Sequence, residues 1–224
     1  MSSLIKLILV LATFFASTFI LVKLTGIISV EKIELWLIAA KNIDTFMLAA
    51  LIIVLLFSDL FIAVPTLTVM ILSGYFLGHM YGAITSIIGV MLAGITGYML
   101  SCIFGEKLES LIVKDPQQRL ALREQFTRYG LLMIIFSRAI PILPEITACL
   151  SGLTKMPFLR FLFAWTVSSV PYAIIATYSG SISSIENPKP AIITAVALTA
   201  IMWSAWFLIK RLSKQATKQD FINN

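Results

Sequence analysis

Charged residues and histidine are scarce in this chain of 224 residues, of which 12% are Asp, Glu, Lys or Arg and 59% are hydrophobic. A soluble domain has about 25% charged and about 45–50% apolar residues. The composition therefore excludes a water-soluble single domain, and it excludes a disordered chain as well. One histidine and two cysteines are too few for a disulfide framework, a zinc site or a Ser-His or Cys-His nucleophile. The sequence predicts an integral membrane protein.

Long uncharged runs mark the predicted membrane spans. A spanning helix needs about 20 apolar residues, so a chain of this length has room for five or six spans and no separate catalytic domain. The predicted spans are 7–22, 45–64, 83–104, 161–180 and 191–209. The short first run is interpreted as a retained helix rather than a signal peptide, because no Ala-x-Ala cleavage site follows it.

Two further apolar stretches, about 65–82 and about 131–154, contain helix breakers and predict re-entrant helical hairpins. The residues expected to shape them are Pro65, Gly74, Gly78, Pro141, Pro144 and Gly152. Irregular backbone at membrane depth is tolerated only against protein or water, so each hairpin should line a cavity. Both stretches carry Leu-Ser-Gly and are predicted to enter from opposite faces. This is typical of an inverted repeat, within an all-α membrane protein of about five spans.

The positions of basic residues predict the orientation of the chain. In this layout 14 of the 17 Lys and Arg residues lie on one side, which the positive-inside rule assigns to the cytoplasm. The C-terminus is then cytoplasmic and the N-terminus external. We predict three regions: an N-terminal span with an interfacial connector (1–44), a core (45–180), and a last span with a basic tail (181–224).

Three charged residues fall at membrane depth, where each costs about 2.5–3.5 kcal/mol unless it has a partner or a function. Arg138 would hold an anionic head group through its forked donors, while Glu145 and Asp59 would exchange protons. Two structural alternatives stay open. An Arg138–Glu145 ion pair would brace the second hairpin, and Asp59 would cap the turn of the first.

Other polar and small residues support weaker hypotheses. Lys155 and Arg160 flank the exit of the second hairpin, where they would attract lipid phosphates or act as ordinary positive-inside anchors. His79 is predicted to be interfacial, because one histidine without partners is no metal site. Close helix packing is predicted for Gly89, Gly94 and Gly97, and a packing or interfacial role for Trp36, Trp165, Trp203 and Trp206. The sequence predicts no cofactor, no metal and no nucleic-acid partner.

Two motifs then resemble a known family. They are Leu-Ser-Gly-Tyr-Phe-Leu-Gly at 72–78 and Arg-x-x-Pro-x-x-Pro from Arg138, followed eight residues later by Gly152. Over about 45–180 the chain resembles the DedA superfamily, also called the SNARE-associated Golgi protein or VTT-domain family. The resemblance implies two facing re-entrant hairpins. It also implies undecaprenyl phosphate recycling, as in bacterial members, or phospholipid scrambling, as in eukaryotic relatives.

The resemblance extends to individual site residues. It implies a functional role for Arg138, which matches the motif directly. It implies one for Asp59 more loosely, as an acid that precedes the first hairpin. Many members place a second arginine after the proline pair, where this chain has Glu145.

The leading hypothesis is a flippase- or scramblase-like lipid translocase in the inner membrane. Its partners would be anionic or phosphate-bearing lipids, its transport could be coupled to protons, and a homo-oligomer is left open. The alternatives are a proton- or cation-coupled small-solute transporter, an intramembrane lipid-modifying enzyme and a structural membrane protein. The enzyme ranks low because no second histidine is present.

Overall fold

The computed structural model describes residues 44–62, 64–112, 115–140 and 142–183, with isolated positions before and after them. The predicted spans 7–22 and 191–209 and the connector 23–44 lie in large part outside the described residues. Within the described residues every regular element is a helix. The elements are α3 (Thr45–Ser58), α4 (Thr66–Leu77), α5 (His79–Ile112), α6 (Pro116–Ile135), the 3₁₀ turn η1 (Ser137–Ala139), α7 (Leu143–Leu153) and α8 (Phe158–Ser181).

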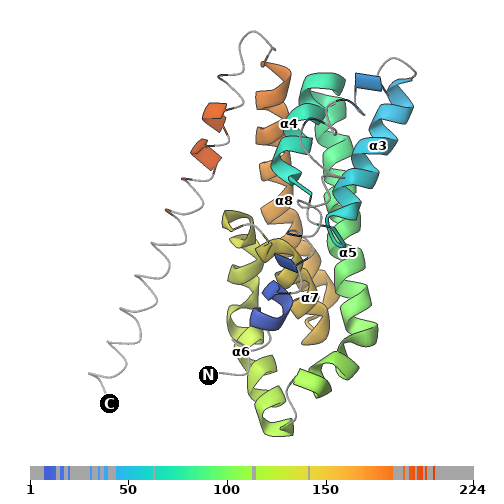
Figure 1. Cartoon of the computed structure of the whole chain (residues 1–224). Coiled ribbons are helices and arrows are strands. Elements are labelled where there is room, and N and C mark those ends of the chain that lie inside the picture. Colours follow the sequence, from blue (N-terminus) through green and yellow to red (C-terminus); the bar gives the residue numbers. More distant parts are fainter. Residues whose placement is uncertain are drawn as a thin grey trace.

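Two of these helices are long enough to cross a membrane. They are the His79–Gly105 part of α5 and the whole of α8, and no more than about a third of the residues in their most apolar stretches are buried. Large apolar side chains such as Ile103 and Phe163 are more than 60% exposed, as expected for surfaces that face lipid. These helices correspond to the predicted spans 83–104 and 161–180. Both run the length of the molecule in Figure 1.

The first half departs from the predicted layout. Where a span was predicted over 45–64, α3 has 14 residues, or about 21 Å, which is short of the roughly 30 Å hydrocarbon core. The helix ends at Ser58, and Pro65 precedes the first residue of α4. Leu56 lies against Gly89 and Leu60 against Gly97, so α3 runs in the same direction as α5. The start of α3 and the α4–α5 turn therefore lie at the same end of the molecule (Figure 1).

The second half contains a comparable break. Much of the polar stretch 105–130 is helical, because α5 continues to Ile112 and α6 begins at Pro116, capped by Asp115, which accepts a hydrogen bond from the Gln117 amide. Helix α6 ends at Ile135, and α7 begins at Leu143 after Ile142, whose φ of 72° is unusual for a β-branched residue. Pro144 is tolerated in the first turn of α7, where an amide donor is not needed. Pro141 lies outside the described residues.

Each short helix crosses the long helix of the other half. A Cβ on Gly74 in α4 would lie 1.9 Å from the carbonyl oxygen of Thr177 in α8, and a Cβ on Gly152 in α7 would lie 2.1 Å from that of Tyr98 in α5. Only glycine permits such backbone contact. The two Leu-Ser-Gly motifs thus occupy equivalent crossings. In Figure 1, α3 and α4 lie toward one end and α6 and α7 toward the other.

Candidate functional site

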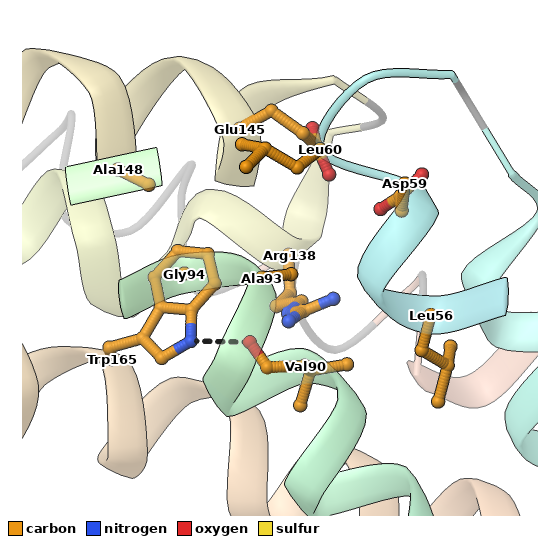
Figure 2. Close-up of a pocket in the computed structure, with 10 residues that line it drawn as sticks. All are labelled: Leu56, Asp59, Leu60, Val90, Ala93, Gly94, Arg138, Glu145, Ala148 and Trp165. Carbon is orange, nitrogen blue, oxygen red and sulfur yellow. Dashed lines mark hydrogen bonds between the residues drawn. The ribbon is translucent and has the colours of Figure 1, made fainter. Parts of the chain in front are cut away.

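A small cavity forms where the two chain breaks meet, residues 59–65 between α3 and α4 and residues 136–142 between α6 and α7. Its lining residues, all labelled in Figure 2, are Leu56, Asp59, Leu60, Val90, Ala93, Gly94, Arg138, Glu145, Ala148 and Trp165. Its volume is about 10 Å³, near the minimum for one water molecule. The three charged residues predicted to lie at membrane depth all line this cavity. We refer to Asp59, Arg138 and Glu145 as the charged cluster.

Asp59 is the most buried member of the charged cluster, with 9% of its surface exposed. Its Oδ1 accepts a hydrogen bond from the Val64 amide at 2.9 Å, which closes the first chain break. This bond matches the alternative in which Asp59 caps the turn of the first hairpin. The same carboxyl group also interacts with Glu145 and Arg138. A purely structural role therefore does not account for all of its surroundings.

Arg138 is held by one face of α8. Its Nη2 donates to Ser169 Oγ at 3.1 Å, and its guanidinium carbon lies 5.5 Å from the ring centre of Trp165 and 5.6 Å from that of Tyr172. Both distances suit cation–π attraction. The buried Nε has no hydrogen-bond partner within the described residues. One donor of the guanidinium is therefore available for a ligand.

Glu145 occupies the first turn of α7. Its Oε2 is buried and has no hydrogen-bond partner in the described part of the chain. Arg138 donates to Ser169 and not to Glu145, so the bracing ion pair considered from the sequence is not the arrangement found. Figure 2 shows the carboxyl groups of Asp59 and Glu145 on the same side of the cavity, with the guanidinium beside them. The carboxyl groups of Asp59 and Glu145 thus lie against each other, and the buried Nε donor of Arg138 has no hydrogen-bond partner among the described residues.

The other predicted site residues lie elsewhere. Lys155 and Arg160 are exposed and absent from the cavity lining. Lys155 lies beyond the end of α7 at Leu153, which is about 12 Å along the helix from Glu145, and its predicted contact with lipid phosphates stays a prediction. His79 packs edge-on against Tyr178 at 5.4 Å. Gly78 forms the α4–α5 turn with a φ of 77°.

Three residues around Arg138 were not predicted as site residues. Trp165 was expected only to pack or to lie at the interface, and Ser169 and Tyr172 were not considered. They are spaced four and three residues apart in α8, which places them on one helical face. This spacing in the sequence could have indicated a shared face of α8. It points to a site only once Arg138 is known to lie against that face. The packing prediction for Gly89, Gly94 and Gly97 is confirmed by side chains of other helices lying against each of them.

The cluster suits binding and proton transfer better than covalent chemistry. A guanidinium binds oxyanions through directed hydrogen bonds, and carboxyl groups accept and release protons. Among the described residues, no group of three or more His, Cys, Asp and Glu side chains could hold a metal ion.

Two comparisons with known proteins find matches. The family model for the VTT domain matches residues 64–182, which include both glycine crossings and two members of the charged cluster. Among curated proteins, "Undecaprenyl phosphate transporter A" of Bacillus subtilis (strain 168) is 26% identical over 92 residues, or 38% of this chain and 46% of that protein. The matched part thus spans about half the length of this relative. No solved structure matches the chain.

Proposed function

Because this chain belongs to the VTT-domain family, we propose that it moves a lipid with a phosphate-bearing head group across the membrane. The name of the Bacillus relative supports a polyprenyl phosphate as this lipid. The observation that carries the proposal is the charged cluster. Arg138, Asp59 and Glu145 line one cavity between helix ends, and the two long helices beside it, α5 and α8, have apolar stretches that are mostly not buried.

The unpaired donor of Arg138 and the two carboxyl groups near it support a role for each member of the charged cluster. Arg138 has an unused Nε donor, and arginine pairs with phosphate oxygens through adjacent N–H groups. Two carboxyl groups share the cavity with this one cation. A phosphate that replaced them at Arg138 would leave excess negative charge unless protons entered with it. We therefore propose that Asp59 and Glu145 exchange protons during transport.

The arrangement of the helices supports a path for the head group. We propose that α3–α4 and α6–α7 are re-entrant hairpins of an inverted repeat and that α5 and α8 cross the membrane. The hairpins would then meet near the midplane, as in transporters that alternate access around a central site. The cavity has room for about one water molecule, so this conformation is closed. The hairpins must separate before a phosphate enters, while the lipid tail stays between the helices and the bilayer.

This arrangement alters the orientation predicted from the sequence. With α3 as a hairpin arm, residues 23–44 lie on the outer side, opposite 105–130. A span at 7–22 then places the N-terminus in the cytoplasm with the C-terminus. In this layout 12 of the 17 Lys and Arg residues remain cytoplasmic, which still satisfies the positive-inside rule. We propose this orientation in a bacterial inner membrane.

The test is a translocation assay with unlabelled lipid. Purified protein is reconstituted in liposomes containing a trace of polyprenyl phosphate or phosphatidic acid, and excess impermeant phosphatase is added outside. The phosphatase releases phosphate only from the outer leaflet, so release beyond the outer half reports translocation. We expect fast release with the wild type, and release limited to the outer half with Arg138→Ala.

A control variant and a comparison of two pH values complete the assay. Arg119→Ala removes an arginine of α6 outside the cavity and should behave as the wild type. If transport is coupled to protons, the wild-type rate will change between two pH values, and Glu145→Gln will lose this dependence. A wild-type rate equal to that of empty liposomes for every phosphate lipid would contradict lipid transport. Proton flux driven by a small solute would then support the solute-transporter alternative.

A further inference from the structure

Trp165 links α5 to α8 at the edge of the cavity. Its indole Nε1 donates to the carbonyl oxygen of Val90 in α5 at 3.1 Å, and the residue is 3% exposed. One helical turn further along α5, a Cβ on Gly94 would lie 2.2 Å from Cε2 of this indole and 2.3 Å from Nε1. The indole therefore rests directly on the α5 backbone. Any side chain at position 94 would displace it.

The same indole forms one wall around the guanidinium of Arg138. The guanidinium carbon lies at similar distances from the rings of Trp165 and Tyr172, and Ser169, which lies between them in α8, accepts its hydrogen bond. All three contacts come from a single helix. Side chains of α8 thus contact the guanidinium on several sides. One of them, the indole of Trp165, is itself held against the backbone of α5.

Arg138 needs such external support because of its own location. It belongs to the three-residue turn η1 between two helices. No long helix therefore fixes its backbone. An arginine side chain loses rotamer entropy when it is fixed in one conformation. Holding it in place before the ligand arrives removes this cost from binding. The two rings and Ser169 supply that preorganisation.

We propose that Trp165 and Tyr172 are positioning residues for Arg138 and that Gly94 acts through Trp165 by leaving room for the indole on α5. The device orients the guanidinium so that its unpaired Nε is presented to a phosphate oxygen. This inference rests on the proposed function for the nature of the ligand. The inference itself is that removing the ring of Trp165 or Tyr172, or adding a side chain at Gly94, weakens head-group binding.

The test compares four variants in the phosphatase assay with increasing mole fractions of phosphatidic acid or polyprenyl phosphate, whichever the wild type transports. Gly94→Ala displaces the indole, Trp165→Leu removes one ring, and Tyr172→Leu removes the other. We expect each to raise the apparent KM about tenfold, within the range of cation–π energies in desolvated sites. Trp165→Phe keeps a ring face and should recover most of the affinity.

One control variant and one kinetic criterion separate positioning from a loss of folded protein. Gly105→Ala introduces a methyl group on α5 against Leu153, about 16 Å along the helix from Gly94, and should leave the apparent KM unchanged. Loss of folded protein lowers the maximal rate but not the apparent KM. Should Trp165→Leu fail to fold, Tyr172→Leu and Gly94→Ala still decide the question.

The outcomes also separate this inference from the proposed function. If Arg138→Ala transports like the wild type, the proposed function is wrong. If Arg138→Ala is inactive while Gly94→Ala and Tyr172→Leu keep the wild-type apparent KM, the proposed function stands and only the positioning inference is overturned.

Discussion

Asp59 accepts a hydrogen bond from the backbone amide of Val64, 2.9 Å away, and so closes the break between α3 and α4. The same carboxyl group faces Glu145 and Arg138. Asp59 is therefore both part of the fold and part of the charged cluster. These two roles can be separated by mutation, because the hydrogen bond needs only an acceptor oxygen whereas the cluster uses the charge.

Asp59→Asn keeps an oxygen that can accept from the Val64 amide, and Asp59→Ala removes it. We expect the asparagine variant to unfold at nearly the wild-type temperature in detergent, yet to lose most of its lipid translocation. The alanine variant leaves a buried amide unpaired, which costs about 1–3 kcal/mol, so it should also melt at a lower temperature. Thermal unfolding and the phosphatase assay together check both expectations. Equal destabilisation by the two substitutions would show that the hydrogen bond to Val64 contributes little.

The two glycine crossings predict a matched pair of destabilising substitutions. Gly74→Ala and Gly152→Ala each place a methyl group about 2 Å from a carbonyl oxygen of a facing helix, where neither backbone can retreat without moving a helix. We expect each to cost about 3 kcal/mol or more and to reduce the yield of monodisperse protein. Gly78→Ala is the matched control, because it meets no atom within 4 Å. Its backbone, with φ 77° and ψ 170°, lies in a region open almost only to glycine, so this substitution should cost about 1–3 kcal/mol without pushing two helices apart. Wild-type stability of Gly74→Ala or of Gly152→Ala would contradict the crossings.

The direction of α3 predicts a labelling pattern that differs from the layout inferred from the sequence. If α3 is a hairpin arm, a cysteine at Asp44 should react with an impermeant thiol reagent from the same side as a cysteine at Ser183. A cysteine at Arg160 should react from the opposite side. The background is the chain with Cys102 and Cys149 replaced by serine, and each variant must retain translocation. If Asp44→Cys instead labels with Arg160→Cys, then residues 45–64 form the full span predicted from the sequence.

The features that depend on local sequence were predictable. The proline pair indicated the break between α6 and α7. The first hairpin was expected over about 65–82, whereas the first break lies at residues 59–65 and Pro65 directly precedes α4. The spans expected over 83–104 and 161–180 lie within about four residues of the apolar stretch His79–Gly105 and of α8. Charged residues inside apolar sequence indicated Asp59, Arg138 and Glu145, because their burial requires a reason wherever they lie. The family resemblance is confirmed over residues 64–182.

The features that depend on contacts between distant residues were not predictable. An apolar run that reaches Val64 looks long enough to span the membrane. The helix nevertheless ends at Ser58, and the Val64 amide donates a hydrogen bond to Asp59 in the turn that follows. Sequence pattern cannot distinguish these cases, because hydropathy is the same in both. The support of Arg138 by Trp165 was missed for a related reason. It requires knowing that Gly94, 71 positions earlier in the chain, provides the surface on which the indole rests.

The surroundings of Arg138 predict that a lysine cannot replace it. Arg138→Lys keeps a positive charge that the rings of Trp165 and Tyr172 can still attract. An ammonium group lacks the planar fork that bonds Ser169 with one nitrogen and presents another to a phosphate. We therefore expect a folded protein whose translocation is reduced at least tenfold, with a higher apparent KM for the phosphate lipid, while Arg138→Ala is inactive. Circular dichroism and thermal unfolding would verify the fold of each variant. Wild-type transport by Arg138→Lys would mean that the cavity requires only a positive charge, and head-group recognition through the fork of the guanidinium would then be wrong.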